Sequence, residues 1–261
     1  MAAGLGALQG VTEFLPISSS GHLSLAQIWL GVDLSAVGHR FNIVVHAGTL
    51  VAVLWEYRRD LVKLLRGVFV GDAEARKLFL GLVIATLPLG LVLTPPIEST
   101  ILAVEANPRW IGVGLWITAA LLTFAHLRRP RDTGGDVLPS PPSALAIGLF
   151  QLLAVTPGIS RSGSTIAAGV GLGLSRVAAA RFSFLLSIPA ILGASAKESL
   201  AILREPAPAT DEWTVFAIGF AVSLVVGLLS LRLLVHLLVR VGLLPFVPYL
   251  VLAGAAAYFA G

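Results

Sequence analysis

The sequence of 261 residues contains no cysteine and few charged side chains. The lack of cysteine excludes disulfide bonds and thiolate metal sites. Only 12% of the residues are charged and 56% are hydrophobic, whereas ordinary soluble domains carry about a quarter charged residues. The mean hydropathy is +0.90. This composition excludes an ordinary soluble protein and predicts an integral membrane protein.

The charged residues that are present are more often basic than acidic. They give a formal net charge of +4 and an isoelectric point near 10.0. Basic residues of membrane proteins gather in cytoplasmic loops and beside anionic headgroups. We therefore expect membrane lipids as partners and no binding of nucleic acid.

The hydrophobic residues fall into six long blocks. Each block approaches the ~20 residues that a helix needs to cross a hydrocarbon core about 30 Å thick. The blocks are Phe41–Trp55, Leu78–Leu93, Trp110–Leu127, Phe182–Leu203, Trp213–Leu231 and Leu243–Phe259. We expect one transmembrane helix from each, in a single all-α polytopic membrane domain that spans residues 1–261.

Two segments of the chain resemble each other at a constant spacing. Gln9 and Gln151 lie 142 positions apart, and the same offset aligns Ile17–His22 with Ile159–Ser164, with four of six residues identical. A fixed offset in both matches indicates an internal duplication. The predicted parts are repeat one at about 1–129, a linker rich in Pro, Gly and Asp at about 130–142, and repeat two at about 143–261.

Each repeat begins with an interrupted hydrophobic segment, Ala2–Leu30 in the first and Ser143–Leu174 in the second. Proline, glycine and hydroxyl residues at their centres would leave backbone groups unpaired in a lipid-facing helix. We therefore predict two re-entrant helix–loop–helix segments. Three spans follow each one, so the second repeat is inverted, and paired broken helices of this kind mark a binding site near the bilayer midplane.

The first loop follows an acidic residue within an apolar segment. Glu13 shares a helix face with Gln9, one turn earlier. A carboxylate in a membrane normally faces a cavity or a partner, so Glu13 can bind a divalent cation or act as a general base. The alternative is a polar contact that only holds helices together.

The residues after Glu13 add hydroxyls and an imidazole. Ser18, Ser19 and Ser20 precede Gly21 and His22. These serines supply a nucleophile or anion-binding hydroxyls, and free backbone N–H groups at the start of the next helix attract phosphate. A serine beside a histidine base is a usual arrangement for covalent catalysis.

The second loop supplies the complementary charge. Arg161 lies between Ser160 and Ser162 and is followed by Gly163. A buried arginine needs an anion, and its planar fork suits phosphate oxygens. The alternative is a purely structural ion pair with Glu13. A lipid phosphate fits this place better than a soluble anion because the partner enters from the membrane.

The two loops together resemble a known family. The motifs Gln9-x-x-x-Glu13-Phe-Leu-Pro-Ile-Ser-Ser-Ser-Gly-His22 and Pro157-Gly-Ile-Ser-Arg-Ser-Gly163 are similar to the signature motifs of the undecaprenyl pyrophosphate phosphatases, the bacitracin-resistance family. The resemblance implies a multi-pass enzyme of the bacterial inner membrane. It would hydrolyse undecaprenyl pyrophosphate to undecaprenyl phosphate and inorganic phosphate, recycling the lipid carrier for cell-wall synthesis and giving bacitracin resistance. The resemblance further implies Mg²⁺ or Ca²⁺ as cofactor, an active site open to the periplasm, and homodimers.

The resemblance also assigns roles to individual residues. Ser19 and His22 match the family's candidate nucleophile and base, and Ser160–Ser162 match its pyrophosphate-binding residues. The family accepts Glu or Gln at the first motif position, and Gln9 leaves Glu13 as the one carboxylate of this motif. The expected catalytic residues are Glu13, Ser19, His22 and Arg161, with Glu13 also the metal ligand. The expected substrate-binding residues are Gln9, Ser18, Ser20, Ser160, Ser162 and Gly163.

The mechanistic hypothesis places the pyrophosphate between the two loops. Arg161 and its neighbouring serines hold the phosphate oxygens, and a cation bridges them to Glu13. Ser19 or a water attacks the terminal phosphorus while His22 accepts the proton. The alternative function is a transporter or flippase of a polyprenyl phosphate lipid, because inverted repeats with broken helices are transporter architecture.

Overall fold

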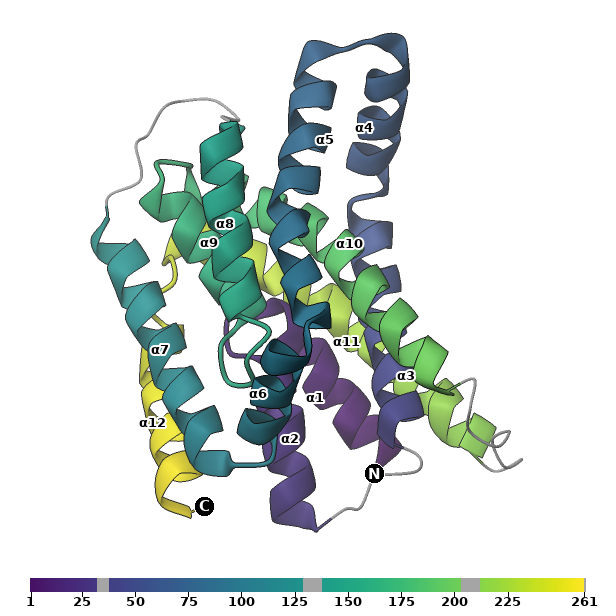
Figure 1. Cartoon of the computed structure of the whole chain (residues 1–261), viewed down its shortest axis with the longest axis vertical. Helices are drawn as coiled ribbons and strands as arrows, with labels where there is room; N and C mark the ends of the chain where they lie inside the picture. Colours follow the sequence, from purple (N-terminus) through teal and green to yellow (C-terminus); the bar gives the residue numbers. More distant parts are fainter. Residues whose placement is uncertain (32–37, 129–137, 203–211, 261) are drawn as a thin grey trace.

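The computed structural model describes residues 1–31, 38–128, 138–202 and 212–260 (Figure 1). All regular elements in these ranges are helices, which confirms the all-α prediction. They are α1 (Ala2–Phe14), α2 (Ser19–Leu30), α3 (Gly38–Glu56), α4 (Arg58–Val70), α5 (Ala73–Thr86), the 3-10 helix η1 (Leu87–Leu93), α6 (Pro95–Glu105), α7 (Pro108–Leu127), α8 (Pro141–Leu153), α9 (Arg161–Gly171), α10 (Arg176–Ile202), α11 (Glu212–Arg240) and α12 (Phe246–Ala260). Most of the predicted linker, residues 130–137, lies outside the described residues.

Four helical segments among the described residues are long and apolar enough to cross a membrane. They are Ala73–Leu93, Pro108–Leu127, Arg176–Leu200 and Glu212–Arg240. The chain is therefore an integral, polytopic membrane protein. The other two predicted blocks lie in α3, which carries Arg40, Asn42 and His46, and in α12, which has only 15 residues. The count of six spans stays a prediction.

The segment after the first predicted span, which carries several basic residues, forms a helix. Helix α4 follows α3 after a single residue, Tyr57, and forms with α5 a hairpin that projects beyond the other helices (Figure 1). Local sequence features determine where α4 ends and α5 begins. Gly71 closes α4 with φ 85°, and the Asp72 side chain caps α5 by accepting a hydrogen bond from Ala75 N at 2.7 Å. Such a cap pair is typical of a tight helix–helix turn.

Both predicted helix–loop–helix segments are present, as α1–α2 and α8–α9. Ser18 caps α2 by accepting a hydrogen bond from Gly21 N, and Ser160 caps α9 by accepting one from Gly163 N. The two capping serines are related by the offset of 142 residues found in the sequence. Figure 1 shows the two hairpins approaching from opposite ends of the molecule with their loops meeting between them. An inverted duplication would produce this arrangement, and its relation to the membrane stays a prediction.

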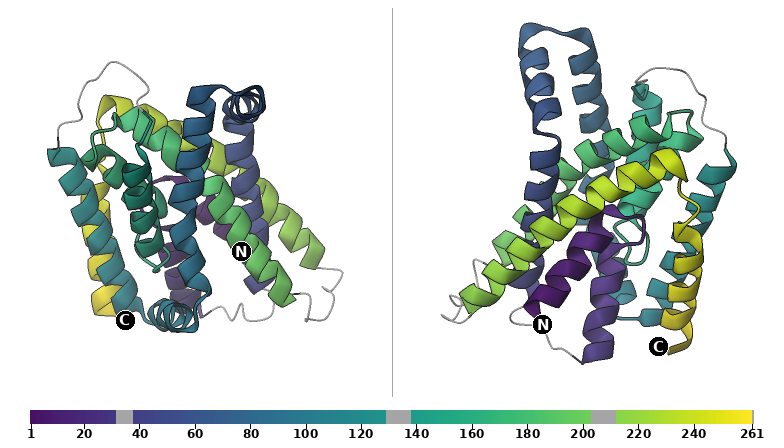
Figure 2. Two further views of the ribbon diagram at one scale, coloured as in Figure 1. Left: turned by 45° about the horizontal axis from the view of Figure 1, so that its top comes forward. Right: turned by 180° about the vertical axis from the view of Figure 1, so that it is seen from behind.

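Small residues bring α1 close to α11. A Cβ added at Gly6 would lie 2.8 Å from Gly219 O, and one added at Gly10 would lie 2.8 Å from Gly227 N. Membrane helices use such residues to let backbones approach. Figure 2 shows α11 crossing α1 when the molecule is seen from behind. The packing fixes the end of α1, where Phe14 is buried, and hence the position of the first loop.

Candidate active site

Glu13 lies at the centre of the contact between the two loops. Its Oε2 accepts hydrogen bonds from Ser19 Oγ at 2.6 Å and from Gln9 Nε2 at 3.1 Å. Its Oε1 accepts one from Arg161 Nη2. His46 Nε2 on α3 is 3.9 Å from Oε2. The structure thus gathers three of the predicted site residues, Gln9, Ser19 and Arg161, around one buried carboxylate.

The two loops are joined directly by hydrogen bonds. Gly158 N donates to Ser18 Oγ at 3.1 Å, and Ser162 Oγ donates to Leu15 O at 3.3 Å. Thr118 on α7 secures the second loop, since its Oγ1 accepts from Ser160 N at 2.9 Å and donates to Gly158 O at 3.0 Å. Sequence reasoning missed Thr118. The one feature of the sequence that could have indicated it is a hydroxyl residue inside an apolar span.

Ser18 has an unusual backbone. Among the described residues, Ser18 is the one non-glycine residue with a positive φ, which is 73°. This region costs about 1–2 kcal/mol for a residue with a Cβ, and such strain is often found at functional sites. It lets the Ser18 carbonyl face the next turn, where it accepts hydrogen bonds from His22 N at 3.2 Å and from His22 Nδ1 at 2.8 Å.

Gly158 is predicted to be essential for the meeting of the loops. Its φ is +92°, and an added Cβ would lie 2.2 Å from Ile111 O. Gly158→Ala should therefore destabilise the protein by roughly 2–5 kcal/mol, the sum of backbone strain and overpacking. Gly173→Ala is the matched control, because Gly173 has φ +95° with no atom within 4 Å of the added Cβ. Thermal unfolding in detergent measures both, and equal losses would contradict this role of Gly158.

The expected pair of Ser19 and His22 is not formed. His22 Nε2 is instead 2.6 Å from Tyr249 Oη on α12, and within the described residues Ser19 and His22 share no hydrogen bond. Both lie in the first turn of α2, but Ser19 points to Glu13 while the His22 ring stacks on Tyr249. The hydrogen-bond partner of Ser19 in the structure is thus the Glu13 carboxylate, and the roles of Ser19 and His22 as nucleophile and base stay a prediction.

The remaining predicted substrate-binding residues support the loops. Ser20 Oγ is 3.5 Å from Ser18 Oγ. Ser160 Oγ is 3.2 Å from Ser162 Oγ while it caps α9 at Gly163 N. These contacts link the hydroxyls within each loop, and their binding of substrate stays a prediction.

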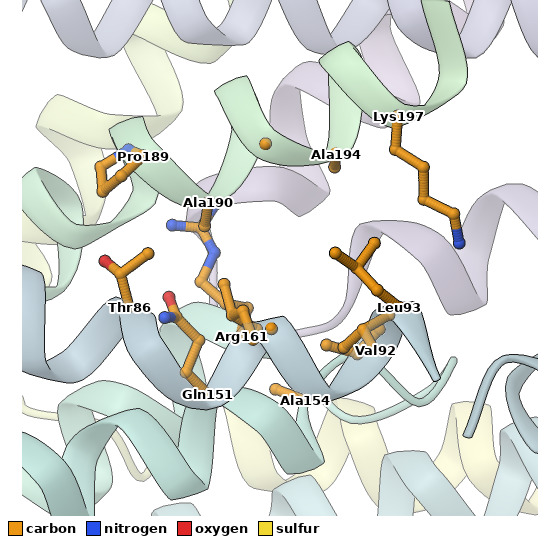
Figure 3. A pocket seen from close by; sticks show the side chains of 14 residues that line it. Thr86, Val92, Leu93, Gln151, Ala154, Arg161, Pro189, Ala190, Ala194 and Lys197 are labelled. Carbon is orange, nitrogen blue, oxygen red and sulfur yellow. The ribbon is translucent and has the colours of Figure 1, made fainter. Parts of the chain in front are cut away.

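Arg161 joins this polar centre to an apolar cavity. Its Nη2 bonds Glu13, whereas its Nη1 is buried without a hydrogen-bond partner among the described residues. The cavity has a volume of about 320 Å³ and lies between η1, the end of α8, and α10. Figure 3 shows Arg161 reaching into it, with Lys197 toward one end. Lys197 Nζ pairs with Glu98 Oε1 on α6 at 2.6 Å. A guanidinium group that lines an apolar cavity can bind the phosphate of a lipid.

The donor set around Glu13 suits a hard cation that takes ligands from its substrate. No group of three His, Cys, Asp or Glu side chains within the described ranges could hold a metal alone. Gln9 Oε1, however, is buried without a hydrogen-bond partner in the described structure, next to the Glu13 carboxylate. Carboxylate and amide oxygens are ligands for Mg²⁺ and Ca²⁺, and Mg²⁺ commonly completes its shell with substrate phosphates and water.

Comparison with known proteins gives consistent matches over the whole chain. The family model described as bacitracin resistance protein BacA matches residues 2–256. An undecaprenyl-diphosphatase of Alcanivorax borkumensis is 39% identical over 263 residues, covering 98% of this chain and 96% of that protein. One of Rubrobacter xylanophilus is 38% identical, covering 94% and 92%, and one of Desulfosudis oleivorans is 41% identical, covering 98% and 96%.

Proposed function

Because the chain belongs to the bacitracin resistance protein BacA family, we infer that it is a membrane phosphatase that hydrolyses undecaprenyl pyrophosphate. The relatives named undecaprenyl-diphosphatase match it over nearly their full length. The reaction breaks the phosphoric anhydride bond, releases inorganic phosphate and leaves undecaprenyl phosphate, the lipid carrier of cell-wall synthesis. The resemblance expected from the two loop motifs is therefore confirmed at the level of the family.

The site assignment rests on the unpaired Nη1 of Arg161. This nitrogen is buried without a hydrogen-bond partner in the described structure, whereas Nη2 donates a hydrogen bond to Glu13. A buried donor without a partner costs free energy unless a ligand satisfies it. The terminal phosphate of the substrate is the partner we propose, because a guanidinium can bind two phosphate oxygens at once.

The apolar cavity offers a place for the polyprenyl chain. A second cavity of about 500 Å³ shares Thr86, Gly90 and Pro189 with the first and continues along α5 and α10. The lining of both is mainly leucine, valine and other apolar side chains. We place the first isoprene units here, so that the chain stays in apolar surroundings while the pyrophosphate reaches Arg161.

Ser19 and Glu13 form the proposed nucleophile and base. Their oxygens are 2.6 Å apart, which is within the range for an activated nucleophile. When Arg161 turns to the phosphate, Glu13 is free to accept the Ser19 proton. Ser19 Oγ bonds the terminal phosphorus as the bridging P–O bond breaks, and undecaprenyl phosphate leaves. A water then cleaves the phosphoserine, giving inorganic phosphate: His22 Nε2 accepts the proton of that water, and Glu13 returns its proton to the leaving Ser19 Oγ.

A divalent cation bound by Glu13 and Gln9 Oε1 would neutralise pyrophosphate charge, which is the main demand in phosphoryl transfer. We expect a chelator to abolish phosphate release from the purified protein. Gln9→Glu adds a second carboxylate, so we expect the Mg²⁺ concentration for half-maximal activity to fall about tenfold. Mg²⁺ should also raise the unfolding temperature of this variant more than that of the wild type. Full activity in chelator, with no Mg²⁺ effect on either protein, would refute a cation site here.

The proposed location is the bacterial inner membrane, with the active-site cavity open to the periplasm. The basic residues of the α4–α5 hairpin support this orientation, since such residues favour the cytoplasmic side. They are Arg58, Arg59, Lys63, Arg66, Arg76 and Lys77. The hairpin projects at one end of the molecule, whereas α6 lies toward the other (Figure 1). Helix η1, which precedes α6 in the chain, lines the first cavity.

Phosphate release separates the proposed enzyme from the alternative transporter. The purified protein in detergent is expected to release one inorganic phosphate from each undecaprenyl pyrophosphate and to leave the monophosphate lipid. Exchange of the lipid between vesicle leaflets without release of phosphate would overturn the proposal and favour a flippase.

A further inference from the structure

His22 has two well-defined partners that the proposed reaction does not explain. Its Nδ1 is 2.8 Å from Ser18 O, and its Nε2 is 2.6 Å from Tyr249 Oη. The two rings are stacked, with centroids 5.7 Å apart and an interplanar angle of 13°. Tyr249 comes from the last helix, 227 residues from His22 along the chain.

The chemistry of these partners fixes the form of the neutral imidazole. A carbonyl oxygen can only accept a hydrogen bond, so the Nδ1 of His22 must carry the proton that is donated to Ser18 O. The Nε2 of His22 then carries the lone pair and accepts the hydrogen bond that Tyr249 Oη donates. The histidine therefore presents its basic nitrogen to the tyrosine.

Helix α12 is held firmly enough to make this contact specific. Two residues after Tyr249, Val251 O accepts a hydrogen bond from Trp116 Nε1 of α7 at 3.1 Å. Farther along α12, Gly254 lies so close to α7 that a Cβ on Gly112 would be 2.6 Å from Gly254 O. Helix α7 also carries Thr118, which secures the second loop.

We propose that Tyr249 is a positioning residue of the active site, which acts through His22. It holds the ring plane and the Nδ1–H tautomer, so that Nε2 is the atom that accepts a proton from the attacking water. In that step the tyrosine hydroxyl gives way to the water, and the tyrosine itself neither gains nor loses a proton. The proposal rests on the proposed hydrolysis, and it adds the C-terminal helix to the elements that build the site.

Tyr249→Phe tests the proposal because it keeps the ring stacking and removes only the hydroxyl. We expect kcat for undecaprenyl pyrophosphate to fall about tenfold, the scale of one hydrogen bond, with KM unchanged. Tyr258→Phe is the matched control on the same helix, since Tyr258 packs against Trp116 and Phe259 and should keep wild-type kcat. In a His22→Gln background, Tyr249→Phe should cause no further loss, because both changes remove one coupled unit.

The ring ¹⁵N spectrum of histidine-labelled protein supplies a test that does not depend on turnover. The acceptor-nitrogen signal that disappears in His22→Gln should shift in Tyr249→Phe and stay in place in Tyr258→Phe. An unshifted signal, wild-type kcat in Tyr249→Phe, or a further loss in the double variant would each overturn the proposal. If the wild-type protein fails to release phosphate, the proposed function fails, while the ¹⁵N signals still report whether Tyr249 holds His22.

Discussion

Replacing Arg161 by alanine is expected to lower kcat/KM for undecaprenyl pyrophosphate by about a thousandfold or more. The Arg161 side chain has one nitrogen paired with Glu13 and one free beside the apolar cavity. An arginine that neutralises charge in phosphoryl transfer is worth about 10³–10⁵ in rate. Inorganic phosphate release in detergent measures the loss.

The alanine variant also loses stability, so a second variant is needed to isolate the chemistry. Removing Arg161 leaves the buried carboxylate of Glu13 without its cation, which costs about 3–5 kcal/mol. Arg161→Lys keeps the charge but lacks the planar fork that holds two oxygens. We expect its unfolding temperature to stay near that of the wild type while its kcat/KM falls about a hundredfold. Wild-type kinetics in Arg161→Lys would contradict the assignment.

An ion pair outside the site provides the control for Arg161. Arg232 Nε bonds Glu56 Oε2 at 2.8 Å, and the Arg232 side chain is 53% exposed. An exposed pair of this kind contributes roughly 0–1 kcal/mol. Arg232→Ala should therefore keep both the activity and the unfolding temperature of the wild type, which shows that the loss in the Arg161 variants comes from the site.

Ser19→Ala and Glu13→Gln are expected to lower kcat by similar large factors, about 10³-fold or more. Their side chains form one unit, linked at 2.6 Å, in which the serine supplies the nucleophilic oxygen and the carboxylate accepts its proton. Residues that act as a unit are strongly non-additive in kinetics. The double variant should therefore be no slower than either single variant.

Two further observations decide the role of Ser19. Acid-quenched wild-type enzyme should carry label from the terminal phosphate of the substrate, and Ser19→Ala should carry none. Ser24→Ala removes a hydroxyl one turn farther along α2, where it bonds Ser20 O at 2.9 Å, and should leave kcat unchanged. Near-normal turnover in Ser19→Ala would show that water attacks directly.

The sequence predicted the parts of the site better than the contacts among them. The constant offset between Ser18 and Ser160 located both loops, because proline, glycine and hydroxyl residues cannot continue a helix through lipid. The sequence also predicted that Glu13 and Arg161, which come from different repeats, meet in one polar centre. The structure shows that these two side chains form an ion pair. This ion pair is the contact that the sequence also allowed as a purely structural one.

The contacts that were missed depend on side-chain direction and on distant helices. Ser19 and His22 lie within one turn, yet one faces α1 and the other faces α12. No local pattern marks Tyr249 as a partner of His22, since that contact exists only after α12 has packed on α7.

The most direct test of the proposed site is a structure of the wild-type protein with a methylene analogue of undecaprenyl pyrophosphate, which cannot be cleaved at the bridging position. We expect Arg161 Nη1 to lie within hydrogen-bond distance of a terminal phosphonate oxygen, Ser19 Oγ to face the terminal phosphorus, and the first isoprene units to lie between η1 and α10. A bound analogue whose phosphonates lie away from both loops, with Arg161 paired only to Glu13, would contradict the site.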